Sequence, residues 1–160
     1  MSQYPPIGFH FSVAFQLAGS PSETLANVID GGKDLAREFR FQEVSGLEVE
    51  LEMESVVEGG QNRFTWQLPK RTRYSDLTLK RGMVVGSDII KWCRDALENF
   101  SFSPANIQVS LLNEKHEPVQ TWFVLHAIPK KWSVSGFNAQ ESSIVIESLT
   151  LSYQYFNVIT

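Results

Sequence analysis

Apolar and polar residues alternate along most of this chain, and the alternation is clearest from Leu47 to Glu54. Leucine, valine and methionine occupy the odd positions there, and glutamate occupies every even position. A strand turns successive side chains to opposite faces, so this stretch predicts a strand with one apolar and one acidic face. Neighbouring glutamates on such a face lie roughly 6.6 Å apart and repel by roughly 0.6 kcal/mol in water. The acidic face must stay hydrated, because burying unpaired carboxylates costs far more.

This strand is expected to form the first arm of a long β-hairpin. The arms are predicted at residues 47–57 and 63–68, and the turn at 58–62 has the sequence Glu-Gly-Gly-Gln-Asn. Phe64, Trp66 and Leu68 alternate and are expected to share one apolar face. Pro69 is expected to end the second arm, because proline cannot donate to the strand ladder.

The same period of two predicts most of the remaining elements. Further strands are expected at residues 9–17, 39–44, 77–82, 107–112, 119–128, 132–137 and 144–155. Pro129 is expected to separate the strands on either side of it. Residues 22–38 lack a clear period, and we interpret them as a loop with at most a turn or two of helix.

One segment has helical spacing instead. Ile89, Cys93 and Leu97 recur on one stripe after Ser87-Asp88, a plausible N-cap pair, which predicts a single helix at residues 88–99. Many strands with one helix predict a mainly β fold. We expect a β-barrel or two orthogonally packed antiparallel sheets, with one flanking helix and a long hairpin.

Composition is that of an ordinary soluble protein, with 42% hydrophobic and 20% charged residues in 160. This length suits a single domain spanning residues 1–160. Cys93 is the one cysteine, which excludes an intrachain disulfide and a cysteine-based zinc site. The N-terminal residues lack the features of a signal peptide, and no apolar run approaches the roughly 20 residues of a membrane helix. We expect neither a secretory signal nor stable membrane insertion.

Catalytic and cofactor motifs are not found in the sequence. It contains no nucleophile elbow, no phosphate-binding glycine loop and no His-Glu-x-x-His pattern. The glutamate row does not suit glycoside hydrolysis, which needs two carboxylates with different pKa values in one cleft. We expect no enzyme activity, no metal and no cofactor.

Charges are segregated around the hairpin. Residues 43–58 contain six acids and no base, and residues 63–81 contain six bases and one acid. The two segments could pair within one molecule across the hairpin, as surface charges commonly do. Alternatively, they could form a self-complementary surface that assembles head to tail. Specific nucleic-acid binding ranks last, because the net charge is −4 and Tyr74 is the one aromatic residue among the bases after Trp66.

An ordered series of short motifs resembles the tail-tube proteins of contractile phages and phage-like injection particles. No single motif is specific, but together they follow the family order over roughly residues 9–156. The motifs are Phe41-Gln-Glu-Val-Ser-Gly-Leu-Glu, Glu58-Gly-Gly-Gln-Asn, Leu68-Pro-Lys, Leu77-Thr-Leu-Lys-Arg-Gly, Trp92, Val109-Ser-Leu-Leu-Asn, Pro118-Val-Gln-Thr-Trp, Pro129-Lys-Lys-Trp, Phe137-Asn-Ala-Gln and Ile146-Glu-Ser-Leu-Thr-Leu-Ser-Tyr.

The resemblance implies a structural subunit without a catalytic site or cofactor. Six copies would form a ring, rings would stack into a hollow inner tube, and sheath contraction would drive the tube through a target membrane. Implied partners are further tube rings, the spike or baseplate hub, and the sheath. The particle would assemble in the bacterial cytoplasm and could be released from the cell.

The resemblance and the residue patterns together assign three sets of site residues. The subunit interface is expected to include Leu47, Val49, Leu51, Met53, Phe64 and Trp66. The tube lumen or an inter-ring junction is expected to be lined by Glu48, Glu50, Glu52 and Glu54. An inter-ring or sheath-facing basic surface is expected at Lys70, Arg71, Arg73, Lys80 and Arg81.

Two alternatives remain open. Residues 22–38 are long for a plain tube subunit, which leaves room for a tube-initiating or terminal ring paralogue of the same particle. A different class is a monomeric β-barrel that binds a small apolar ligand, with the eleven phenylalanines and four tryptophans as pocket lining. An enzyme is a third possibility for which the sequence nominates no residues.

Overall fold

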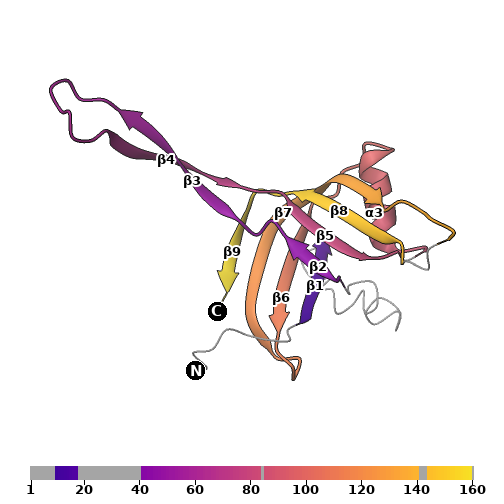
Figure 1. The fold of residues 1–160 in the computed structure, drawn as a ribbon. Coiled ribbons are helices and arrows are strands. Elements are labelled where there is room, and N and C mark those ends of the chain that lie inside the picture. The colour runs from indigo at the N-terminus through magenta and orange to yellow at the C-terminus, as the bar shows by residue number, and fades with distance from the viewer. Residues whose placement is uncertain (1–9, 18–40, 84, 141–143, 160) are drawn as a thin grey trace.

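The computed structural model describes residues 10–17, 41–83, 85–140 and 144–159, and it is mainly β with one described helix (Figure 1). The region expected as a loop, residues 22–38, lies outside the described part. The strands are β1 (His10–Leu17), β2 (Glu43–Ser45), β3 (Val49–Val56), β4 (Trp66–Tyr74), β5 (Leu77–Gly82), β6 (Ala105–Leu112), β7 (Pro118–Val134), β8 (Ile146–Ser152) and β9 (Tyr155–Ile159), and the helix is α3 (Asp88–Leu97).

Strand β7 joins two antiparallel sheets. Its first part pairs with β6 and β9, and β6 pairs in turn with β1. Its second part pairs with β8, followed by β5 and β2. The strands of the two groups run in clearly different directions (Figure 1), as expected where one strand turns a corner between packed sheets. The prediction of two packed antiparallel sheets with one flanking helix is confirmed.

The corner in β7 lies at His126, which the sequence pattern did not mark. His126 has a left-handed backbone with φ 51°, and its N–H donates to Asn106 Oδ1 at 3.2 Å. The prediction that Pro129 separates two strands is wrong, because β7 continues through it. The register shifts between Pro129 and Lys131, and such an irregularity accommodates a residue that has no N–H to donate.

The last predicted strand, residues 144–155, is two strands in the structure. The ladder breaks after β8 and resumes in β9 on the other part of β7. Within β8, Glu147, Leu149 and Leu151 share one face and are all buried.

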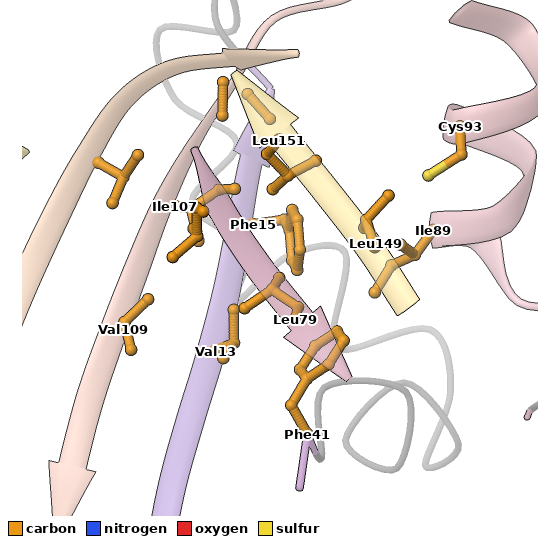
Figure 2. Close-up of a cluster of buried hydrophobic side chains, with 14 residues drawn as sticks. Val13, Phe15, Phe41, Leu79, Ile89, Cys93, Ile107, Val109, Leu149 and Leu151 are labelled. Carbon is orange, nitrogen blue, oxygen red and sulfur yellow. The ribbon is translucent and has the colours of Figure 1, made fainter. Parts of the chain in front are cut away.

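The core lies between the two sheets. Val13, Ile107 and Val109 come from β1 and β6, and they meet Leu79 and Leu151 from β5 and β8 (Figure 2). All five residues are at least 98% buried. Strand alternation places one buried side chain at every second position, which explains why period two marked these strands.

Helix α3 covers part of this core. It was expected at residues 88–99 and ends two residues earlier, within the usual uncertainty of helix ends. Its apolar stripe buries Ile89, Cys93 and Ala96, and Cys93 points from the helix toward the sheet in Figure 2. Ser87 occupies the N-cap position but makes no side-chain capping bond.

Candidate assembly surface on the β3–β4 hairpin

The β3–β4 hairpin projects from the body of the molecule (Figure 1). The two strands form a separate two-stranded sheet, and among the described elements each makes extensive contact only with the other. An isolated two-stranded hairpin is marginally stable in water. The hairpin is therefore a candidate surface for contact with another chain.

The second arm of the hairpin is longer than predicted. Strand β4 runs from Trp66 to Tyr74 and passes through Pro69, so the prediction that Pro69 ends the arm is wrong. Leu51 pairs with Thr72 and Met53 pairs with Pro69, which leaves one extra residue in β4. A proline is tolerated here because it lies at a bulge in a strand with a single partner.

This bulge divides the apolar side chains between the two faces of the hairpin. Val49, Leu51 and Met53 lie on one face near the base, as predicted by strand alternation. Directly paired residues share a face, and Trp66 pairs with Val56. Trp66 therefore lies on the glutamate face, opposite to Leu51.

Apolar exposure is consequently present on both faces. Leu68 pairs with Glu54 and joins Val56 and Trp66 on the glutamate face near the tip. The paired apolar residues of both faces are between 41% and 50% exposed; they are Val49, Leu51, Met53, Val56, Trp66 and Leu68. Soluble proteins rarely leave so many neighbouring apolar side chains uncovered unless a partner covers them.

The acidic face is less uniform than the sequence indicates, because β4 places bases on it. Arg73 lies opposite Glu50, and Arg71 Nε lies 3.1 Å from Glu52 Oε2. Lys80 forms a further exposed pair with Glu43 at 3.4 Å. Pairing within one molecule, the first of the two explanations for the segregated charges, is therefore observed for Arg71 and Lys80. Such exposed pairs stabilise a fold by at most about 1 kcal/mol.

Arg81 does not belong to a basic surface, and that expectation is wrong. Its side chain is 3% exposed, and its Nε lies 2.9 Å from Glu147 Oε2, which is itself 4% exposed. The Arg81 guanidinium also donates to Ser87 Oγ at 2.8 Å, and Trp132 Nε1 donates to Glu147 Oε1 at 2.8 Å. This buried network joins β5, β7, β8 and the start of α3.

The remaining predicted residues keep an exposed position or lie near the body. Leu47 is half-buried and packs against the core of its own chain, so less of it is left for a partner. Phe64 lies in the connection before β4, and its ring meets Trp66 edge to face at 5.0 Å. Three of the glutamates and three of the bases are exposed outright; they are Glu48, Glu50, Glu54, Lys70, Arg71 and Arg73.

Sequence reasoning missed an exposed aromatic corner after α3. Phe100 is 80% exposed, and its ring meets that of Phe102 at 5.8 Å. Phe100 has φ 54°, a left-handed conformation that usually belongs to glycine after a helix. The Phe-x-Phe pattern alone could not distinguish this corner from a core strand.

Ligand and metal sites find little support in the described residues. The cavity between α3 and the β5–β8 sheet measures about 10 Å³, the space of about one water. An open hollow of about 380 Å³ on the outer side of α3 is lined partly by Lys91, Arg94 and Asp95, which does not suit an apolar ligand. No cluster of three metal-ligating side chains occurs among the described residues. None of the described helices is long and apolar enough to cross a membrane.

Comparison with known proteins identifies relatives across nearly the whole chain. The sequence profile of the T4-like virus tail tube protein gp19 family matches residues 8–157. No curated protein sequence gives a significant match.

Similar solved structures come from contractile particles. A chain in the anti-feeding prophage baseplate structure is 28% identical with a TM-score of 0.81, and the match covers 99% of this chain and 97% of that one. A chain in the anti-feeding prophage cap is 21% identical with a TM-score of 0.75, covering 100% and 94%. A chain in the sheath-tube complex of the extracellular contractile injection system PVC is also 21% identical at 0.75, covering 99% and 93%. The two matches at 21% identity support the fold alone.

Proposed function

The chain belongs to the T4-like virus tail tube protein family, and we propose that it is a structural subunit of the inner tube of a contractile injection system. In this proposal six copies form a ring, and rings stack into a hollow conduit that sheath contraction drives through a target membrane. The proposed role is mechanical and needs no catalytic site.

One observation carries the proposal beyond family membership, namely the uncovered hairpin. A projecting two-stranded ribbon with half-exposed apolar residues such as Leu51, Met53 and Trp66 is unfavourable in a lone subunit. Burial against neighbouring copies would remove this surface from water. Each such side chain would contribute on the order of 1 kcal/mol, half of the usual value for full burial.

The division of apolar residues between the two faces has a consequence for assembly. A single neighbour that covers only the face of Leu51 would leave Val56, Trp66 and Leu68 in water. We therefore propose that neighbouring chains cover the face of Leu51 near the base and the glutamate face only near the tip, where Val56, Trp66 and Leu68 lie. The interface residues remain Leu47, Val49, Leu51, Met53, Phe64 and Trp66, extended by Val56 and Leu68.

Introducing a charge on each face tests this interface. Leu51→Lys and Trp66→Lys place a cation on opposite faces of the hairpin, and each is expected to block rings and tubes in electron micrographs while far-UV circular dichroism stays unchanged. Val119→Lys is the matched control, because Val119 on β7 has the same 49% exposure as Leu51. Normal assembly of both hairpin variants would exclude the hairpin as an interface.

The glutamate row and the bases receive proposed places in the same assembly. Glu48, Glu50, Glu52 and Glu54 are proposed to face the lumen or the junction between rings, where water keeps them hydrated. Lys70, Arg71 and Arg73 are proposed to face an adjoining ring, because Arg71 and Arg73 lie on the same face of the hairpin as the glutamates. A map of the assembled particle with the glutamates on the sheath-facing wall would exclude the lumen version.

A ring at one end of the tube is the second candidate. It is favoured by the 28% identity and TM-score of 0.81 with a chain of the anti-feeding prophage baseplate structure, against 21% and 0.75 for the PVC sheath-tube complex. In this version the subunit initiates the tube above the spike or baseplate hub. Electron microscopy of the purified protein separates the two, because a shaft subunit forms long tubes and an initiating ring stays single.

The proposed partners are further copies or paralogous tube rings, the spike or baseplate hub, and the sheath. We propose that the particle assembles in the bacterial cytoplasm and is afterwards released from the cell. The competing class, a monomeric β-barrel with an apolar ligand, predicts a single chain at high concentration. Native mass spectrometry distinguishes that outcome from hexamers, and only hexamers or larger species agree with the tube proposal.

A further inference from the structure

The base of the hairpin is held by a group of contacts that we name the hairpin clamp. It consists of Gly46, Tyr74, Asp76, Lys130, Tyr153 and Phe156. Gly46 follows β2 where the chain enters the hairpin, and Tyr74 is the last residue of β4 where the chain leaves it. The other members come from the body or from the link between β4 and β5.

Three aromatic rings form the centre of the clamp. The Tyr74 ring meets Tyr153 at 6.0 Å and Phe156 at 5.2 Å, both edge to face. Tyr153 and Phe156 are themselves 6.2 Å apart, and both pack against the core of the body. Edge-to-face pairs of this kind are directional. They therefore fix the orientation of β4 relative to the body as well as its position.

Polar contacts hold the entering strand beside the leaving one. The Tyr153 hydroxyl donates to the Gly46 carbonyl at 3.3 Å, and Ser75 N–H donates to the Glu48 carbonyl at 3.2 Å. A side chain at Gly46 would bring its Cβ within 1.9 Å of the Asp76 carbonyl oxygen. Gly46 also has φ 93°, so the close approach of the two strands requires glycine.

An ion pair next to these contacts connects the base of the hairpin to β7. Lys130 Nζ lies 2.7 Å from Asp76 Oδ2, and Lys130 follows Pro129 where the register of β7 shifts. The clamp therefore links the hairpin to both β7 and the β8–β9 junction. From Tyr74 toward the tip, by contrast, the hairpin makes extensive contact with no other described element.

We propose that this clamp fixes the direction of the hairpin before assembly, and that Tyr74, Tyr153 and Phe156 are its positioning residues. The direction matters because the hairpin is long, so a small rotation at its base moves its tip a large distance. Eight residues of β3 span about 26 Å, so a 10° swing at the base moves the far end by about 4.5 Å, nearly one strand spacing. A hairpin aimed in advance also avoids an ordering cost at the moment of binding.

The proposal rests on the proposed function only for the use of the hairpin, because its orientation is a property of the single chain. The test uses the full chain with spin labels on cysteines introduced at Asn62, near the tip, and Lys115, in an exposed turn of the body. The native Cys93 is buried and is not expected to take up label. Pulsed electron paramagnetic resonance in dilute solution then measures the distribution of tip-to-body distances.

Four chains are compared. The unmodified clamp and Tyr74→Phe, which keeps the ring, are expected to give one narrow distance distribution. Tyr74→Ala removes the hairpin's ring and is expected to widen the distribution by several ångströms, about the displacement of a 10° swing. Tyr155→Ala is the control, because Tyr155 is a neighbouring exposed aromatic residue on β9, and it should leave the distribution narrow.

Distance and assembly give distinguishable outcomes. A distribution for Tyr74→Ala as narrow as that of the parent chain overturns the clamp, whatever happens to assembly. A widened distribution with intact rings or tubes supports the clamp but contradicts the proposed role of the hairpin in assembly. Should Tyr74→Ala unfold, Tyr153→Phe removes only the hydroxyl bond to Gly46; it is expected to widen the distribution less, and no widening then overturns the clamp.

Discussion

The buried Arg81–Glu147 pair makes the sharpest prediction for the body of the molecule. Glu147→Gln keeps the shape of the side chain and an oxygen for Trp132, but it removes the charge that faces Arg81 at 2.9 Å. At that separation an effective dielectric constant of about 20 gives an attraction of about 6 kcal/mol. The glutamine can return about 2 kcal/mol through a hydrogen bond to the cation. The expected loss of unfolding free energy is therefore about 4 kcal/mol, within the usual range for one broken buried pair.

Urea denaturation followed by tryptophan fluorescence measures this loss. With a denaturant slope of about 2 kcal/mol per molar for a protein of this size, the midpoint should fall by about 2 M. Glu52→Gln is the matched control, because it breaks an ion pair of nearly the same length, 3.1 Å, whose arginine is 77% exposed. Exposed pairs contribute at most about 1 kcal/mol, so the control should shift the midpoint by less than about 0.5 M.

A double variant separates the loss of the pair from the isolation of its partner. Arg81→Met with Glu147→Leu removes both charges and replaces them by apolar side chains of similar size. Replacement of a whole buried pair is commonly neutral or stabilising, so the double variant should recover most of the stability that Glu147→Gln loses. A free energy of unfolding for Glu147→Gln within about 1 kcal/mol of the parent chain would refute the reasoning.

Three further predictions concern single residues. Phe100→Gly should raise the free energy of unfolding by about 1 kcal/mol, because φ 54° favours glycine and the ring is 80% exposed; a lower urea midpoint would contradict this. Burial, with a smaller effect of nearby Tyr74, raises the pKa of Tyr153 to about 12 from its usual 10. Its neutral form therefore stabilises the fold below pH 10, and this contribution is lost as the pH rises through 12. The urea midpoint of Tyr153→Phe should therefore decrease less between pH 10 and 12 than that of the parent chain. An equal decrease in both chains would exclude this contribution of Tyr153. Burial, reinforced by the Glu147 charge, raises the pKa of the Cys93 thiol to about 12, so Ellman's reagent should react with it only on unfolding, and rapid reaction of the native chain would contradict that.

Sequence reasoning succeeded where burial on one face leaves a local signature. Leu77 and Leu79 in β5, and Leu149 and Leu151 in β8, alternate with less buried residues, and all four form the core. The stripe of α3 is visible for the same reason at a period near 3.6. These patterns record the environment of each residue directly and need no knowledge of its distant neighbours.

The burial of Arg81 could have been found from the same signal. It continues the Leu77–Leu79 alternation on β5, and Glu147 shares the buried face of Leu149 in β8. Counting Arg81 with the neighbouring Lys80 as one basic run hid this alternation. A charged residue at a core position of a strand is better interpreted as half of a buried pair, because an unpaired buried charge is too costly.

The bulge of β4 and the corner of β7 could not be found in this way. Both depend on which residue of one strand meets which residue of another, and a shift by one position exchanges the two faces. Pro69 lies at the bulge of β4 and Pro129 at a register shift just after the corner of β7, yet a proline alone predicts an interruption as readily as a bulge. Only the pairing register shows that Trp66 and Leu51 lie on opposite faces.

The body and the hairpin therefore divide the sequence into residues for folding and residues for assembly. The body closes its own core and pairs its buried charges, so changes at Glu147 are expected to reduce the stability of the single chain. The hairpin leaves Leu51 and Trp66 half exposed on opposite faces, so changes there should leave the body folded and affect what the chain binds. Tyr74 lies at the boundary, because its ring belongs to the hairpin and its contacts belong to the body. A change at Tyr74 should thus leave both halves intact and alter only their relative direction.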